Sequence, residues 1–191
     1  MMENKTEYIT KSVQEPLLKS EDIPDIDLYM DQVIQLFEQK FGSTKRHEED
    51  KILTKTMINN YAKGKLFFPI KNKKYSKNHL ILISLIYQLK GILSINDIKD
   101  TLSALNKEVT ETNRSLESFY ESYLAVQTKN AEHFKEEAAL IDIEAAEEMQ
   151  PKDKELEPIL KIASMIHMSQ MYKKAAETLI DELKLEADQK G

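Results

Sequence analysis

The chain has 191 residues, of which 41% are hydrophobic and 31% charged, and its net charge at neutral pH is −6. This balance is typical of a globular protein with one domain, or with a small domain and a helical extension, and it excludes a wholly disordered chain. The absence of cysteine excludes disulfide bonds and thiolate metal sites. No apolar run approaches the roughly 20 residues of a membrane span and the N-terminus lacks a signal peptide's apolar centre, so we expect a cytoplasmic protein without membrane contact.

The first part of the chain predicts an arm, a helix and a loop. Residues 1–22 are polar without a sustained period, which is typical of a flexible N-terminal arm. Apolar residues then recur at helical spacing from Tyr29 to Phe41, so we expect an amphipathic helix that begins at Asp25 or Asp27 and ends near Gly42. The charged stretch 43–50 predicts a loop.

A second, short helix is expected to begin after Thr54 as its N-cap and to end at Gly64, which suits the left-handed conformation that closes many helices. One side of this helix is apolar, and the other carries lysine, hydroxyl and amide groups without a carboxylate. A solvated face is the usual explanation of such a side. Asparagine can, however, pair with adenine edges at two points, and lysine can reach phosphate or guanine, so we interpret this face as one that contacts DNA.

The next residues predict a turn or ribbon and two more helices. Pro69 cannot donate a main-chain hydrogen bond and ends the preceding unit. The stretch Lys71–Tyr75 is too short for a helix and is consistent with a two-stranded ribbon or wing. Ser76 is expected to cap an apolar helix that runs to Gly91, and Ser94 a short helix after it.

Lysine is concentrated in this part of the chain. Nine lysines and no acidic residue lie between Lys51 and Asn96, whereas the rest of the chain has 18 basic and 33 acidic residues. Such a block attracts polyanions, and for a helix followed by a basic loop the commonest polyanion is double-stranded DNA. The residues expected to contact DNA are Lys55, Thr56, Asn59, Asn60, Lys63, Lys71, Lys73, Lys74, Tyr75 and Lys77.

These motifs resemble the winged helix-turn-helix of the mercury-resistance-regulator (MerR-like) family. The family's pattern is a recognition helix, a Leu-x-x-Pro exit, a basic wing, and a Tyr-Ser pair that opens the next helix. The matching residues are Ile58, Tyr61, Leu66, Pro69, Tyr75, Ser76, His79 and Leu80, followed by Gly91, Ser94, Ile95, Asp97 and Ile98. The sequence departs from the family at Asn59-Asn60, where Arg-Tyr is usual, at Lys65, where the family has glycine, and in the long loop after Gly42.

Three segments are more similar to an uncharacterised Gram-positive bacterial family known only as a domain of unknown function. They are LYMDQV at residues 28–33, LTKTMINNY at 53–61 and KKYSKNHL at 73–80, and the resemblance covers residues 23–105. Together the two resemblances imply a mainly α fold: a MerR-like winged helix-turn-helix with a small β wing at residues 23–105, followed by long C-terminal helices at residues 106–191.

The C-terminal half predicts helices that need a partner. An apolar seam with alternating spacings of three and four runs through Leu102, Leu105, Val109, Leu116, Phe119, Tyr123 and Val126, and it is typical of a coiled coil. Pro151 is expected to end this helical region, and a last helix from Pro158 to about Leu185 has apolar residues over more than half of its circumference. We therefore expect a homodimer through these helices, in which the seam forms the dimerisation surface.

No pattern indicates an enzyme, a cofactor or a metal site. The sequence has no phosphate-binding glycine loop, and its best metal-like cluster, His133 with Glu136 and Glu137, is more simply a solvated helix face. A stripe of Met165, Met168 and Met171 could line a pocket for a small-molecule effector, although core packing is the commoner explanation. The sequence thus predicts a dimeric, sequence-specific DNA-binding transcriptional regulator. The alternative is a protein-interaction adaptor that uses the basic face for an acidic partner, which could even be its own acidic C-terminal half.

Overall fold

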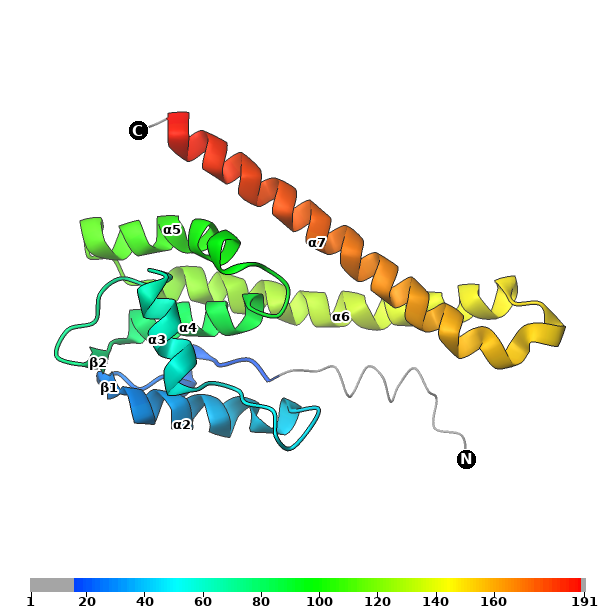
Figure 1. The fold of residues 1–191 in the computed structure, drawn as a ribbon, viewed down its shortest axis with the longest axis horizontal. Helices are drawn as coiled ribbons and strands as arrows, with labels where there is room; N and C mark the ends of the chain where they lie inside the picture. The colour runs from blue at the N-terminus through cyan, green and yellow to red at the C-terminus, as the bar shows by residue number, and fades with distance from the viewer. Residues whose placement is uncertain (1–15, 190–191) are drawn as a thin grey trace. The chain divides into compact units, whose positions relative to one another are not determined.

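The computed structural model describes residues 16–189 and is mainly helical, as expected (Figure 1). The principal elements, in chain order, are β1 (Leu28–Tyr29), α2 (Met30–Phe41), α3 (Lys55–Lys63), β2 (Lys74–Tyr75), α4 (Lys77–Leu89), α5 (Ile95–Thr112), α6 (Glu117–Glu148) and α7 (Glu157–Gln189). Short 3-10 turns lie at η1 (Ser20–Asp22), η2 (Gly42–Thr44) and η3 (Pro151–Leu156). The described residues form two compact units: a core unit of residues 16–124 with 179–189, and a hairpin unit of residues 125–178.

The core unit is built around α4. All residues from His79 to Ile86 are buried, so this helix is enclosed on every side, as its nearly continuous apolar sequence requires. Ser76 begins the helix as predicted, since its side chain and that of His79 form a capping box in which the His79 imidazole accepts from the Ser76 backbone N–H at 3.1 Å. The buried side chains packed with α4 come from α2, α3, α5, α6 and the residue before α6: Phe37, Phe41, Ile58, Tyr61, Ile98, Leu102, Tyr120 and Leu116.

The segment before β1 belongs to this core. Leu18 is 1% exposed, and its carbonyl oxygen accepts a hydrogen bond from the Tyr120 hydroxyl. Residues 16–22 of the expected flexible arm instead pack on the core through Leu17 and Leu18. Two neighbouring apolar residues show no period in the sequence, so the pattern alone does not reveal this contact. Residues 1–15 of the expected arm lie outside the described residues.

A small β ribbon joins the segment before α2 to the segment before α4. β1 pairs antiparallel with β2, with Leu28 opposite Tyr75 and Tyr29 opposite Lys74. Residues 71 and 74 also form a bridge across a two-residue turn, in which Asn72 and Lys73 have φ of 52° and 59°, the pattern of a type I′ hairpin. The ribbon predicted at this position is present, but its pairing with a segment before α2 was not foreseen. β1 leads directly into α2, whose N-cap is consequently Tyr29 and not Asp25 or Asp27.

The seam predicted from Leu102 to Val126 does not form one helix. α5 ends at Thr112, Asn113 takes a left-handed φ of 54°, and α6 begins at Glu117. The turn lets α6 pack on α4, where the Asn78 side chain accepts from the backbone N–H of Leu116 at 3.0 Å. A heptad-like spacing here arises from two separate helices that contribute to the same core.

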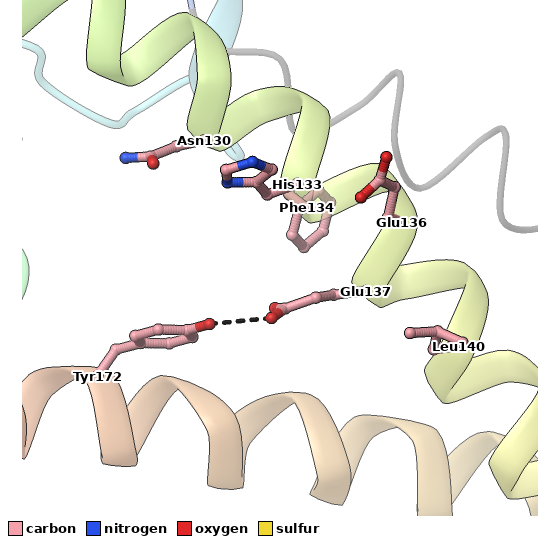
Figure 2. A pocket seen from close by; sticks show the side chains of 7 residues that line it. All are labelled: Asn130, His133, Phe134, Glu136, Glu137, Leu140 and Tyr172. Atoms are coloured by element: carbon pink, nitrogen blue, oxygen red, sulfur yellow. Dashed lines mark hydrogen bonds between the residues drawn. The ribbon is translucent and has the colours of Figure 1, made fainter.

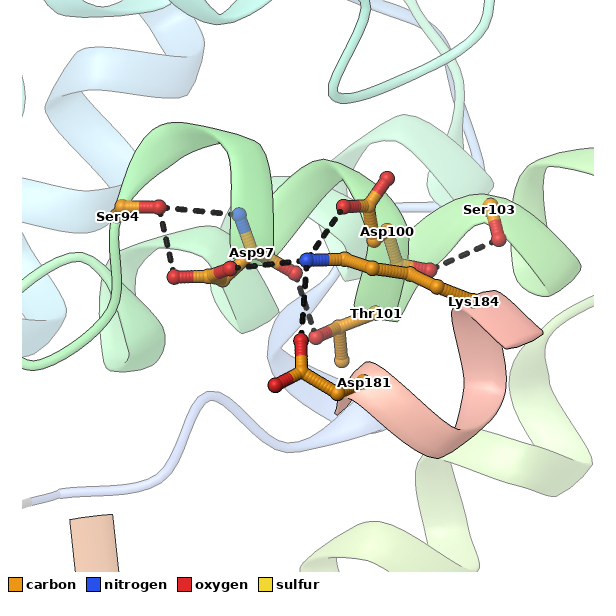
Figure 3. Close-up of polar contacts among 7 residues, drawn as sticks. All are labelled: Ser94, Asp97, Asp100, Thr101, Ser103, Asp181 and Lys184. Carbon is orange, nitrogen blue, oxygen red and sulfur yellow. Dashed lines mark hydrogen bonds and ion pairs between the residues drawn. The ribbon is translucent and has the colours of Figure 1, made fainter. Parts of the chain in front are cut away.

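The last turns of α7 contact α5 within the core unit (Figure 3). The Lys184 ammonium lies 3.3 Å from Asp97 and 3.2 Å from Asp100, and 3.6 Å from Asp181 on its own helix. The hydrogen bonds that the ammonium donates to Asp100 and then to Asp97 raise the pKa of Lys184. This ion-pair cluster and the buried Ile180 hold the last turns of α7 against the rest of the core unit.

The hairpin unit consists of the adjoining parts of α6 and α7 with η3 between them. Ion pairs join Lys161 of α7 to Asp142 of α6 at 2.7 Å and to Glu157 at 2.8 Å. Its buried apolar side chains are only Ala138 and Ala145, whereas ten large apolar residues are exposed: Val126, Leu140, Ile143, Leu156, Ile159, Leu160, Ile162, Ile166, Met171 and Tyr172. Among residues 16–189 no helix has both the length and the apolar content that crossing a membrane requires.

Candidate functional site

α3 presents the polar face that the sequence predicts. The Thr54 side chain accepts a hydrogen bond from the Met57 N–H at 3.2 Å and fixes the start of the helix. Ile58 and Tyr61 are buried in the core, which fixes the rotation of the helix about its axis. The exposed side chains of α3 are those of Ala62 and of the five residues that we predicted from the sequence: Lys55, Thr56, Asn59, Asn60 and Lys63.

The end of α3 places a lysine in a conformation that favours glycine. The Lys65 N–H bonds to the Ala62 carbonyl at 3.1 Å and the Leu66 N–H to the Tyr61 carbonyl at 3.0 Å, the two bonds of a Schellman motif. Lys65 has a left-handed φ of 56°, while Gly64 is helical with a φ of −71°. The prediction that Gly64 takes the left-handed conformation is therefore wrong. We attribute the difference to Leu66, whose complete burial places the left-handed position of the motif one residue later, at Lys65.

The β hairpin at residues 71–74, which is not part of the hairpin unit, carries the second group of residues predicted to contact DNA. Lys71, Asn72 and Lys73 are exposed, and the Lys74 ammonium lies 5.3 Å from the centre of the Tyr29 ring. Tyr75 differs from the other members of the group, because its side chain is 1% exposed and packs beside Phe67 and His79. Tyr75 thus anchors the hairpin in the core and does not face solvent, and burial raises the pKa of its phenol.

Carboxylates from outside the lysine block pair with two of its members. The Lys77 ammonium contacts Glu117 and lies 3.1 Å from Asp25, and the hydrogen bonds that it donates to Glu117 and then to Asp25 raise its pKa. Lys55 lies 2.8 Å from Asp31, and both side chains are largely exposed, so this pair is weak and exchangeable. Lys77, at the start of α4, thus links α4 to the first residue of α6 and to the segment before β1.

Lys90 of the basic block is a structural residue. Its ammonium donates a 2.8 Å hydrogen bond to the Ile52 carbonyl and lies 4.5 Å from the centre of the Tyr87 ring. Burial lowers its pKa. Within the part of the chain that the structure describes, Lys63, Lys65, Lys71 and Lys73 are exposed and form no ion pair, so they carry the unneutralised charge of the site.

The residues of the expected dimerisation seam are divided between core and surface. Leu102 and Leu116 are buried, and Leu105, Val109 and Tyr123 are partly buried against the same core. Phe119 and Val126 remain exposed, at 45% and 52%. Most of the seam is therefore covered by the chain itself, and the larger set of exposed apolar residues lies in the hairpin unit.

A pocket of about 710 Å³ in the hairpin unit contains the metal-like cluster considered from the sequence (Figure 2). His133, Glu136 and Glu137 line it from α6, and the Tyr172 hydroxyl of α7 donates a 3.0 Å hydrogen bond to Glu137. No group of three His, Cys, Asp or Glu residues within residues 16–189 is arranged to hold a metal ion. In the methionine stripe, Met165 and Met168 are partly buried and Met171 is 54% exposed.

Comparison with known proteins identifies the family but no characterised relative. No curated protein and no solved structure matches the chain. Residues 18–123, which include α3, the β hairpin at residues 71–74 and α4, match a family described as Domain of unknown function (DUF1836). The match nearly coincides with the continuous part of the core unit, residues 16–124, and excludes the hairpin unit. It covers more than half of the sequence, and the chain therefore belongs to this family of domains of unknown function.

Proposed function

We propose that this protein is a DNA-binding transcriptional regulator whose core unit is a winged helix-turn-helix of the MerR-like type. The order β1, α2, α3, hairpin and α4 supports this fold, because α2 and α3 are the two helices and the type I′ turn forms the tip of the wing. In this proposal α3 enters the major groove of DNA, and the β hairpin at residues 71–74 contacts the phosphates of the DNA backbone.

The observation that carries the proposal is the conformation of two lysines. Lys65 and Lys73 both have a left-handed φ, where glycine would avoid a cost of about 1–2 kcal/mol per residue. Unfavourable backbone conformations of this kind are concentrated at functional sites. A cationic side chain at two such positions, beside the exposed Lys63 and Lys71, favours a site selected for binding a polyanion.

The side chains on α3 support duplex DNA as that polyanion. Asn59 and Asn60 are exposed between Lys55 and Lys63, and the amide of asparagine can form two hydrogen bonds with an adenine edge in the major groove. A surface that only held phosphates would need the lysines but not the two amides. We therefore assign base contacts to Asn59 and Asn60, and phosphate contacts to Lys63, Lys65, Lys71, Lys73 and Lys74.

The exposed apolar faces of the hairpin unit support a homodimer. A unit whose buried apolar side chains are two alanines has little hydrophobic stabilisation of its own, and large exposed apolar patches mark interfaces. In a two-fold dimer two α3 helices would read half-sites about 34 Å apart, so the operator should be palindromic.

The test is the salt dependence of binding to duplex fragments from around the protein's own gene. If about five phosphates are neutralised, the logarithm of the affinity should fall against the logarithm of salt concentration with a slope of about −4 to −5. Fluorescence anisotropy of labelled duplexes measures this slope. No binding at low salt, or a slope near zero, would contradict the proposal.

The second candidate function is an adaptor that binds an acidic protein through the same face. The adaptor function is favoured by ion pairs that carboxylates of this chain already form with the basic block. They join Lys55 to Asp31, and Lys77 to Asp25 and Glu117. An adaptor would bind an acidic partner without binding the DNA fragments, so the same titration distinguishes the two functions.

A further inference from the structure

A second pocket, with a volume of about 630 Å³, lies in the core unit between α5 and the segment that leaves α3. Its apolar lining comes from consecutive residues of this segment, Phe67, Phe68, Pro69 and Ile70. Lys65 and Asn106 are the amine and the amide that line it. An apolar pocket with a few convergent polar groups is the usual form of a small-molecule site.

The Asn106 amide is held in one orientation and lacks a partner for its oxygen. Its Nδ2 donates to the Leu66 carbonyl at 3.1 Å and to the Leu102 carbonyl at 3.0 Å, which excludes the flipped amide. Its Oδ1 is buried and has no hydrogen-bond partner among the described residues. Buried acceptors are nearly always satisfied, so this oxygen identifies a place where a donor from outside the protein would be stabilised.

Lys65 supplies a positive charge at the same pocket. It is exposed, it forms no ion pair among the described residues, and its left-handed backbone is held by the Schellman bonds at the end of α3. An ammonium on a long side chain above an apolar wall is complementary to a carboxylate attached to an apolar body.

We propose that this pocket binds a small organic acid that carries an N–H donor, of the chemical class of the N-acyl amino acids. Lys65 binds the carboxylate, the side chain of the ligand packs on Phe68 and Ile70, and its amide N–H satisfies Asn106 Oδ1. Binding requires the side chains that now cover this oxygen to move aside. The site shares Lys65 with the proposed DNA contact, but it needs no nucleic acid and is tested without it.

The experiment is an NMR titration of the full-length, ¹⁵N-labelled protein with N-acetylphenylalanine. We expect saturable shifts confined to residues 62–70 and 102–110. N-acetylphenylalanine amide, which lacks the charge, and 3-phenylpropanoate, which lacks the N–H donor, should each bind at least several-fold more weakly. Shifts that are absent, unsaturable or spread over the hairpin unit would overturn the proposal, as would equal binding of the three compounds.

A variant and a matched control distinguish binding of the ligand by Lys65 from a general effect of the protein's positive charge. Lys65→Met keeps the apolar length of the side chain and removes the ammonium, and it should weaken binding roughly tenfold, as expected for loss of one charge-assisted bond. Lys63→Met removes a neighbouring charge that does not line the pocket and should leave the affinity unchanged. The spectrum of each variant reports whether it is folded. Equal affinities of the two variants would overturn the assignment of Lys65.

Discussion

The Tyr120 hydroxyl donates a 2.6 Å hydrogen bond to the carbonyl oxygen of Leu18, which lies 102 positions earlier in the chain. The same hydroxyl lies 2.9 Å from the hydroxyl of Ser84 in α4, and Tyr120 has no exposed surface. Burial raises the pKa of this phenol to about 12, so it stays protonated and remains a donor throughout the neutral range. One side chain of α6 thereby connects the N-terminal segment to the central helix.

Tyr120→Phe should destabilise the core unit by about 1–3 kcal/mol, because it leaves the Leu18 carbonyl and the Ser84 hydroxyl buried without this partner. Urea unfolding followed by circular dichroism measures the change in free energy of unfolding. Adding Ser84→Ala to Tyr120→Phe should cost less than the sum of the single changes, since both partners of the 2.9 Å contact are then removed. Strict additivity would show that the two hydroxyls do not interact.

Replacing lysine by glycine should have opposite effects at positions with opposite φ. Lys65→Gly and Lys73→Gly should each stabilise the protein by about 0.5–1 kcal/mol, because glycine adopts the left-handed conformation without the steric cost. Lys63→Gly, within α3, should destabilise it by about 1 kcal/mol. Thermal unfolding measures all three, and destabilisation by both Lys65→Gly and Lys73→Gly would contradict the backbone assignment.

The stability of the core unit should decrease in mild acid because of His79. Its imidazole is buried, Nδ1 accepts from the Ser76 N–H, and Nε2 lies 3.2 Å from the Phe68 carbonyl, to which it donates in this tautomer. Burial lowers its pKa below 6.5, so the unfolded chain binds the proton more tightly. The contribution is complete above about pH 6.5 and is lost as the pH falls through the lower pKa of the folded state.

The control for this effect is His79→Gln, which retains an acceptor at the third position of the capping box and cannot titrate. Urea unfolding midpoints between about pH 7.5 and pH 5 should shift less in this variant than in the wild type. The same shift in both proteins would assign the acid sensitivity to other groups.

The DNA-binding proposal predicts different effects for amide and lysine variants. Asn59→Ala and Asn60→Ala should each weaken binding to the preferred site by about 1–3 kcal/mol and leave binding to random duplexes nearly unchanged. Lys71→Ala and Lys73→Ala should weaken binding to all sequences alike and reduce the slope of the salt dependence by about one each. Equal weakening of random and preferred DNA by the asparagine variants would show that these residues do not read bases.

The homodimer proposal predicts a solution mass near twice the chain mass of 22.2 kDa. Ile162 and Ile166 are 62% and 55% exposed, so charged residues at these positions would be tolerated within the chain and would disrupt an interface. The double variant Ile162→Glu/Ile166→Glu should be monomeric in light scattering at micromolar concentration, with an unchanged core unit. Leu116 is unsuitable for this test because it is buried in the core. A wild-type monomer would exclude the dimer.

The sequence alone determined the elements that depend on neighbours along the chain. Thr54 and Ser76 begin helices where predicted, because an N-cap side chain needs only the backbone two or three residues away. The polar face of α3 was also predictable, since Ile58 and Tyr61 set the helical period. The sequence alone did not give the C-terminal boundary of this part, where the family match ends at residue 123 and the continuous part of the core unit at residue 124.

The tertiary structure decided what depends on contacts between distant residues. It placed Asp25 and Glu117 on Lys77, paired β1 with β2, buried Tyr75, and divided the seam at Asn113. The sequence predicted the left-handed conformation at Gly64, and the structure has it at Lys65, because burial of Leu66 outweighs the preference of glycine for that conformation. The physical reason is common to these cases: local propensities amount to about 1 kcal/mol, and burial of a large apolar side chain contributes about 1.5–3 kcal/mol.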